Sequence, residues 1–214
     1  MTPCLSSAEE SSNNSTWNFY EDHADRYAEE TAAVDMGEIY KRFEKFLPRK
    51  GTLLDAGSGS GRDTKHFLEK GYLVRAFDYS PKLAAISSLF TGIQTEVRSF
   101  EDVSEREAYD GIWACASMLH LSKKEIQTSL AGLSHALRIN GVIYMSFRYG
   151  ETARCDDDGR FYSDLDENMI SQIIEHSECL KMQEIWISIG EDSFKGNGEW
   201  LNVIAKRSGG SDHA

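Results

Sequence analysis

The stretch LLDAGSGSGRDT, residues 53–64, decides the fold. An apolar, strand-like run ends at Asp55, glycines follow at positions 57, 59 and 61, and an amphipathic segment continues to Lys70. Glycines at alternate positions let the backbone turn sharply and approach a ligand without an intervening side chain. The stretch therefore predicts a strand, a ligand-facing turn and a helix in succession.

Strand-like and helix-like segments alternate around this stretch. The segments 52–57, 72–78, 93–97, 109–116 and 142–147 are short, apolar and rich in β-branched or aromatic residues, which is typical of buried strands. Longer amphipathic segments separate them. This alternation predicts an α/β fold, doubly wound, with a mostly parallel sheet covered by helices on both faces.

The segments between the strands carry helix boundary signals. Ser80 before Pro81 is typical of an N-cap followed by proline at the first helical position. Ser122 and Glu125 have the spacing of a capping box. Gly71 and Gly141 lie where we expect helix C-termini.

Both ends of the chain depart from this alternation. Apolar residues at helical spacing over 17–27 and 36–46 predict two helices before the first strand, the second ended by Pro48.

After an expected helix over 164–177, the strand-like segments 180–190 and 199–207 are separated only by the short polar stretch 191–198. So short a connection permits an antiparallel pair and no crossover helix.

The polar ends suggest flexible tails. We expect a single domain over 16–207, with tails at 1–15 and 208–214.

Charge and cysteine content exclude several classes of protein. The 214 residues contain 23 Lys and Arg against 35 Asp and Glu, a formal net charge of -12, which disfavours nucleic acid and anionic membranes as partners. The four cysteines are far apart and suggest neither a metal site nor a disulfide framework. With no apolar span and no signal peptide, we expect a cytoplasmic protein.

Asp78 ends the second strand-like segment, where doubly wound domains place an acid against ribose hydroxyls. The nicotinamide motif G-x-G-x-x-G would put its third glycine at Arg62, so the spacing disfavours a dehydrogenase.

Several motifs together resemble the class I methyltransferases that use S-adenosylmethionine. They are DAGSGSG at 55–61, the acid at Asp78, YDGIWACASMLHL at 109–121 and LRINGV at 137–142. The chain is similar to small-molecule enzymes of the tellurite-resistance and ubiquinone-biosynthesis types. The sequence departs from the usual pattern at 139–140 and at 99–101, where Ser-Phe-Glu replaces Gly-Asp-Ala.

This resemblance implies a seven-stranded sheet of order 3-2-1-4-5-7-6 with the last strand antiparallel. It also implies a helical lid over 16–48 and S-adenosylmethionine as the cofactor, with S-adenosylhomocysteine as the product. The cofactor-binding residues that it implies are Tyr20, Tyr27, Asp55, Gly57, Ser58, Gly59, Gly61, Asp78, Tyr79, Ser80, Ser99, Phe100, Glu101 and Ala114.

Three further residues are expected around the acceptor. His120 follows the fourth strand and has the chemistry of a general base, although a structural role and a base-free reaction stay open. Arg148 and Tyr149 follow the fifth strand, and Arg148 is expected to hold an anionic acceptor or else to pair with Glu151 or Asp156.

The sequence thus predicts in-line methyl transfer to a nucleophilic O, N or S of a small molecule. A tRNA-modifying methyltransferase and a non-catalytic cofactor-binding module stay open as alternatives. The sequence determines neither the acceptor nor the oligomeric state.

Overall fold

The computed structural model describes residues 15–177, 179–192 and 196–209, with the side chains of 191–197 left out. The predicted tails fall almost entirely outside these residues.

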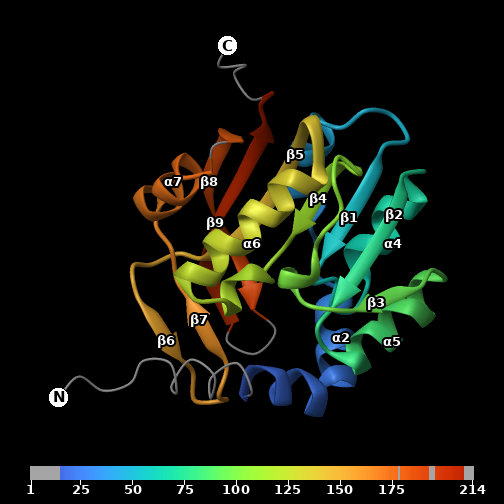
Figure 1. Cartoon of the computed structure of the whole chain (residues 1–214). Coiled ribbons are helices and arrows are strands. Elements are labelled where there is room, and N and C mark those ends of the chain that lie inside the picture. Colours follow the sequence, from blue (N-terminus) through green and yellow to red (C-terminus); the bar gives the residue numbers. More distant parts are fainter. Residues whose placement is uncertain (1–14, 178, 193–195, 210–214) are drawn as a thin grey trace.

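A seven-stranded sheet forms the centre of the molecule (Figure 1). Its strands follow the order β3-β2-β1-β4-β5-β9-β8. β9 pairs antiparallel with both β5 and β8, whereas the other pairs are parallel. Since β8 and β9 are the sixth and seventh strands of this sheet along the chain, the predicted order and the antiparallel last strand are confirmed. The strands are β1 (Thr52–Ala56), β2 (Leu73–Asp78), β3 (Thr95–Val97), β4 (Tyr109–Ala114), β5 (Leu137–Arg148), β8 (Leu180–Asp192) and β9 (Gly196–Arg207).

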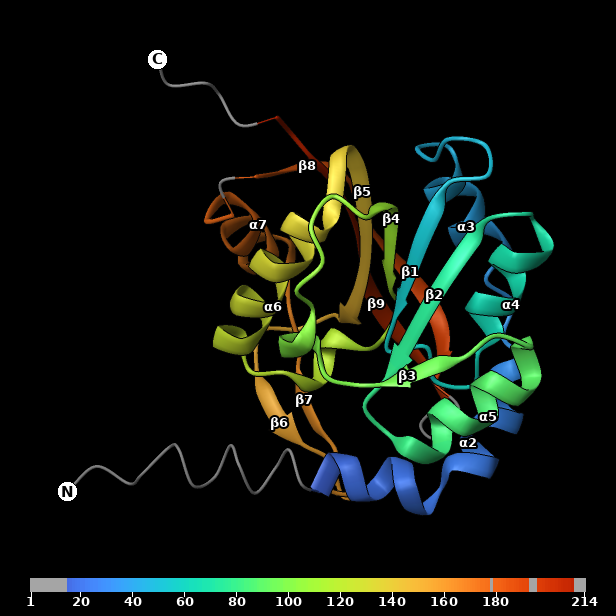
Figure 2. The same ribbon diagram turned by 45° about the vertical axis from the view of Figure 1, so that its right-hand side comes forward.

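Helices cover both faces of the sheet, as Figure 2 shows, with α6 and α7 on one side and α3, α4 and α5 on the other. The helices are α2 (Ala24–Ala32), α3 (Gly37–Glu44), α4 (Arg62–Glu69), α5 (Pro81–Thr91), α6 (Lys123–Ala136) and α7 (Glu167–Glu175), with short 3-10 turns η1 (Phe100–Asp102) and η2 (Met118–His120). The predicted caps are present: Ser80 Oγ accepts from Leu83 N at 3.1 Å, and Ser122 with Glu125 forms the capping box.

Each face of the sheet has its own apolar core. On the α6 and α7 side, residues such as Ile112, Leu133 and Met145 are fully buried. On the other side Phe43, Phe67 and Trp113 form an aromatic cluster. Burial of these large side chains is the main favourable contribution to folding.

Four local expectations need correction. The helix is interrupted at His23. Three helices of the described residues therefore precede β1: residues 15–22, α2 and α3. α6 ends at Ala136 and Gly141 lies inside β5, because Leu137 already has extended backbone and the turn residue with positive φ is Asn140. β8 and β9 run into the stretch 191–198, which was expected to be a loop.

The fourth correction concerns the polar segment 151–162 after β5, whose sequence ETARCDDDGRFY is typical of a loop. It contains a separate hairpin of β6 (Ala153–Cys155) and β7 (Phe161–Ser163).

Candidate active site

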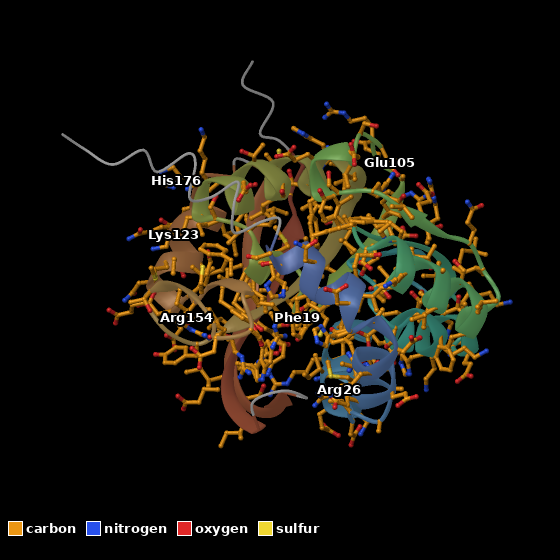
Figure 3. The ribbon with its side chains drawn as sticks, turned by 90° about the horizontal axis from the view of Figure 1, so that it is seen from below. Phe19, Arg26, Glu105, Lys123, Arg154 and His176 are labelled. Atoms are coloured by element: carbon orange, nitrogen blue, oxygen red, sulfur yellow. The ribbon has the colours of Figure 1, made fainter. Side chains whose placement is uncertain are left out.

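The residues that bear chemistry gather at the C-terminal ends of β1, β2 and β4. Ligands bind at this end of open α/β sheets, where neighbouring loops diverge. The helix over 15–22 lies across this end (Figure 1). Figure 3 looks onto it from below, with Phe19 of that helix between Arg26 of α2 and Arg154 of the β6–β7 hairpin.

The helix over 15–22 is held at both sides of the site. Ser15 Oγ donates to the Gly159 carbonyl at 2.7 Å, and Thr16 Oγ1 accepts from Phe161 N at 2.9 Å. On the other side, Lys82 Nζ donates to the Glu21 carbonyl at 2.6 Å. The helix and α2 therefore lie over the site, and α3 packs into the core through Tyr40 and Phe43 while its Glu38 and Ile39 face the site.

The glycine turn leaves β1 and crosses the end of β2. The backbone N–H groups of Gly57 and Ser58 donate to the Phe77 carbonyl at 3.0 and 2.9 Å. Gly59 has φ of +54°, and a Cβ there would lie 3.2 Å from Cε1 of Tyr27. The space above Gly59 is therefore a narrow slot between backbone and a tyrosine ring, open only to a residue without a side chain.

Asp78 is tied to the same turn. Its Oδ2 accepts from Gly59 N at 2.8 Å and its Oδ1 accepts from Ser80 N at 2.9 Å. Burial raises the pKa of Asp78 to about 6, although the backbone donors of Ser80, Gly59 and Tyr79 lower it in part. Each oxygen keeps further acceptor capacity for a hydroxyl.

Two cavities open from this turn. The first, which we name the β2–β3 cavity, has a volume of about 300 Å³. It extends from Asp78 past Phe100 to Ser129 of α6. Its other predicted residues include Tyr79, Ser80, Ser99 and Glu101.

The second, which we name the β5–β9 cavity, has a volume of about 570 Å³. Beside the turn it is lined by Ser58 and Arg62, and farther away by residues that follow β4 and by residues of β5, β7, β8 and β9. These more distant residues include Cys115, Tyr144, Ser146, Arg160, Tyr162, Trp200 and Asn202.

The two cavities meet at a junction of six residues that line both. They are Tyr20, Tyr27, Gly57, Gly59, Ala116 and His120. A ligand that occupied both cavities would pass through this junction, so a group transferred between them would move here.

His120 is held at the junction through both ring nitrogens. Nδ1 lies 2.7 Å from the Phe161 carbonyl, and Nε2 lies 2.7 Å from the Tyr20 hydroxyl. A carbonyl oxygen can only accept, so Nδ1 carries a proton. In the neutral imidazole Nε2 is then the basic nitrogen, and it accepts the hydrogen bond of Tyr20.

Arg160 is the cation on the other side of Tyr20. It is 3 % exposed, its guanidinium lies 4.3 Å from the Phe19 ring centre, and it pairs with Asp158 at 2.8 Å. Although burial lowers its pKa, the hydrogen bond to Asp158 and the neighbouring Tyr20 raise it by more. Tyr20 also hydrogen-bonds to Arg160, so its hydroxyl contacts both a base and a fixed positive charge.

The structure brings twelve of the predicted site residues to the walls of the two cavities. They are Tyr20, Tyr27, Gly57, Ser58, Gly59, Asp78, Tyr79, Ser80, Ser99, Phe100, Glu101 and His120.

Three of the predicted cofactor contacts lie behind the cavity walls. Asp55 is buried and accepts from Thr64 Oγ1 at 2.5 Å. A Cβ on Gly61 would lie 2.7 Å from Ser87 Oγ, so this glycine lets α4 approach α5. Ala114 is fully buried, and the residues that follow it reach the site instead.

The two predicted substrate-binding residues, Arg148 and Tyr149, lie outside both cavities. Arg148 lies over Trp200 at 4.3 Å from the ring centre, because β5 and β9 pair these two residues. Tyr149 is half-exposed and hydrogen-bonds to Glu167. Of the two alternative partners expected for Arg148, Glu151 and Asp156, the second pairs with Arg154.

Sequence reasoning missed Arg160, Tyr162, Trp200 and Asn202 as cavity residues. Their positions depend on how the hairpin and β9 fold back onto the sheet. The alternation in EWLNVIAKR does place Trp200 and Asn202 on one face of a strand. The position of 151–162 after the fifth strand was the signal for Arg160 and Tyr162, since a loop there is expected to flank the substrate entrance.

Within the described residues, no cluster of three or more His, Cys, Asp or Glu side chains could bind a metal ion. None of the helices there is long and apolar enough to cross a bilayer.

Comparisons with known proteins agree with this geometry. Residues 53–141, less than half of the chain, match a family model described as a methyltransferase domain. No curated protein sequence matches. Residues 53–141 carry a methyltransferase domain, and the fold is that of the class I S-adenosylmethionine-dependent methyltransferases.

Solved structures share the fold at low sequence identity. The 1,6-didemethyltoxoflavin-N1-methyltransferase of Burkholderia thailandensis, solved with S-adenosylhomocysteine, is 22 % identical with a TM-score of 0.74, over 98 % of this chain and 92 % of its own. A TehB-like methyltransferase of Corynebacterium glutamicum is 19 % identical with a TM-score of 0.68, over 87 % and 99 %. The magnesium protoporphyrin IX methyltransferase of Synechocystis, solved with S-adenosylmethionine, is 13 % identical with a TM-score of 0.60, over 89 % and 81 %.

The cofactor of this methyltransferase is S-adenosylmethionine, and the site residues fit it. The slot above Gly59 can hold an extended part of the ligand, which a Cβ at this position would exclude. Asp78 can accept hydrogen bonds from two ribose hydroxyls. Arg62 lines the β5–β9 cavity beside the glycine turn, where both oxygens of Asp63 accept hydrogen bonds from its guanidinium.

Proposed function

We propose that this methyltransferase acts on a small molecule bound in the β5–β9 cavity and methylates a nucleophilic O, N or S atom of it in line with the sulfonium. The observation that carries the proposal is the junction, where His120 and Tyr20 face a second cavity beyond the one that suits a nucleoside. The sulfonium supplies an activated methyl group, so alignment and exclusion of water are the main tasks of the chain.

The size and walls of the β5–β9 cavity suit a flat organic molecule. A volume of about 570 Å³ falls within the ordinary range of small-ligand sites. Tyr144, Tyr162 and Trp200 offer aromatic faces. The Burkholderia relative was solved with 1,6-didemethyltoxoflavin bound, and this supports a small acceptor for the present chain as well.

The proton of the acceptor has a defined destination. We propose that it moves to the Tyr20 oxygen while the Tyr20 proton moves to Nε2 of His120, so that the imidazole becomes positively charged. Arg160 stabilises negative charge that develops on the Tyr20 oxygen. The helix over 15–22 brings Tyr20 to the junction, and we infer that it excludes water there when the ligands are bound.

The acidic chain disfavours the tRNA-modifying alternative. A net charge of -12 repels a phosphate backbone. The Tyr20–His120 pair also has no evident task in a module that only binds the cofactor.

A screen for released S-adenosylhomocysteine tests the proposal. Purified protein would receive S-adenosylmethionine with phenols, heteroaromatic N–H compounds and thiols in parallel, and with bulk tRNA in a separate reaction. We expect turnover with a small molecule and none with tRNA. Methylated tRNA with no small-molecule turnover would overturn the proposal.

A further inference from the structure

One side chain in the β2–β3 cavity has no structural partner. Ser129 of α6 is 3 % exposed, lines this cavity, and its Oγ makes no hydrogen bond. A buried hydroxyl without a partner is costly and is rare in folded proteins. The isolated chain therefore keeps an unfavourable group at this place.

Other serines show that the chain could have satisfied this hydroxyl. Ser134, also on α6, donates to the Ala131 carbonyl at 2.8 Å. Ser88 and Ser171 donate to the carbonyl four residues earlier, at 2.7 and 2.6 Å. Among the buried serines of the described residues, Ser129 alone has an unpaired Oγ.

A second unpaired polar atom lies in the wall of the same cavity. Arg98 pairs through its terminal nitrogens with Glu96 and Glu105, but its Nε has no partner. A hydroxyl and an N–H group without partners around one cavity indicate a ligand that brings hydrogen-bonding atoms of its own.

The position of Asp78 sets which part of the cofactor reaches Ser129. Asp78 and Ser80 form the α5 side of the cavity, whereas Leu121, Glu125 and Ser129 form the α6 side. If Asp78 holds the cofactor ribose and the 5′ substituent of that ribose points to the junction, the adenine base extends past Phe100 toward α6.

We propose that Ser129 recognises the adenine of the cofactor, its hydroxyl forming a hydrogen bond to the edge of the ring farthest from the ribose, and that Arg98 Nε supplies a second donor there. Ser129 is then a specificity-determining residue that belongs to α6 and to none of the glycine-turn or acidic motifs. The inference rests on the cofactor assignment and is independent of the acceptor.

Calorimetric titration with S-adenosylhomocysteine tests it, together with thermal melting of the ligand-free protein. Ser129→Ala should weaken the affinity about five- to tenfold, because one hydrogen bond is lost. The same change should raise the melting temperature of the ligand-free protein by about 2 °C, because it removes an unpaired buried hydroxyl. A purely structural role would not move the two quantities in these opposite directions.

Ser134→Ala is the matched control. It removes a buried hydroxyl from the same helix, but that hydroxyl is paired and lines neither cavity. We expect unchanged affinity and a lower melting temperature. 5′-Methylthioadenosine serves as a probe without the amino acid part, and Ser129→Ala should weaken its binding by the same factor.

The outcomes separate this inference from the proposed function. An affinity of Ser129→Ala within twofold of the unaltered protein, or a loss for S-adenosylhomocysteine but none for 5′-methylthioadenosine, would overturn the role of Ser129. Absence of binding by the unaltered protein would overturn both ideas. A loss in Ser129→Ala together with no turnover of any small molecule would support Ser129 and contradict only the proposed function.

Discussion

The two cavities differ in how their walls are distributed along the chain. Apart from the covering helices and the glycine turn, the β2–β3 cavity is built from residues 77–129, within or beside the recognisable motifs. The β5–β9 cavity combines α2 and the turn with residues as distant as Arg160 and Asn202. In the proposed assignment the cofactor half is therefore encoded locally, whereas the acceptor half exists only after β9 has paired with β5. A change in the first cavity should act on cofactor affinity, and a change in the second on turnover.

The largest expected effect is a complete loss of cofactor binding in Gly59→Leu. The slot above Gly59 is closed by the Tyr27 ring, so a leucine side chain would occupy the space of the ligand. We expect no measurable heat of binding with S-adenosylhomocysteine.

Gly71→Leu controls for backbone strain. Gly71 has φ of +86° and follows α4 away from the site, and a Cβ added to it would have no other atom within 4 Å. This variant should lose stability but keep its affinity. Equal loss of binding in both variants would show that strain, and not the slot, is responsible.

His120→Gln should lower kcat about a hundredfold, since general acid–base catalysis contributes at least this much in many enzymes. The affinity for S-adenosylhomocysteine should stay the same, because the effect belongs to the acceptor half. The measurement uses an acceptor found in the release screen.

His23→Gln is its control, because His23 also bonds to a backbone carbonyl, that of Phe19 at 2.9 Å, yet lines neither cavity. If His120→Gln had a kcat as high as that of His23→Gln, His120 would have no role in the chemical step.

Asp78→Ala should weaken cofactor binding by about 1.5 to 3 kcal/mol, or ten- to a hundredfold, because the ribose loses hydrogen bonds to a charged group. An unchanged dissociation constant in the folded variant would contradict the ribose role.

The affinity of the unaltered protein should also depend on pH. Burial places the pKa of Asp78 at about 6, so its carboxylate is ionised at pH 7.5 and protonated at pH 5. Because the ionised form is the better acceptor, the dissociation constant for S-adenosylhomocysteine should rise about tenfold from pH 7.5 to pH 5. Asp78→Asn should abolish this dependence, and a pH profile equal to that of the unaltered protein would exclude Asp78 as its cause.

The smallest expected effect is on kcat/KM, and it should differ between variants of Arg160 and Arg148. Arg160→Gln should lower kcat/KM about tenfold, because the Tyr20 oxygen loses a charged partner. Arg148→Gln should change it less than twofold, since Arg148 lines neither cavity. Steady-state kinetics of both variants with the same acceptor measure the two losses of kcat/KM. A larger loss in Arg148→Gln than in Arg160→Gln would show that Arg148 contacts the acceptor after all.

Much of the fold and half of the site could be predicted from the sequence. The glycine turn, Asp78 and the cap at Ser80 follow from local backbone requirements, which are written in adjacent residues. The sheet order came from a family resemblance, and the short connection between the last strands supported it.

The acceptor half could not be predicted in this way. Arg148 was expected at the cavity because it ends β5, but its pairing with Trp200 in β9 places its guanidinium over that ring. Arg160 reaches Tyr20 through a hairpin that the sequence presented only as a polar loop. Such contacts between distant segments depend on tertiary packing, which local patterns do not encode.

A crystal structure with S-adenosylhomocysteine would test most directly whether the β2–β3 cavity binds the cofactor and the β5–β9 cavity is left for the acceptor. The account predicts adenine against Phe100 in the β2–β3 cavity, the ribose on Asp78, and the sulfur at the junction beside Tyr20 and His120, facing an open β5–β9 cavity. Adenine in the β5–β9 cavity, or a sulfur turned away from His120, would contradict it.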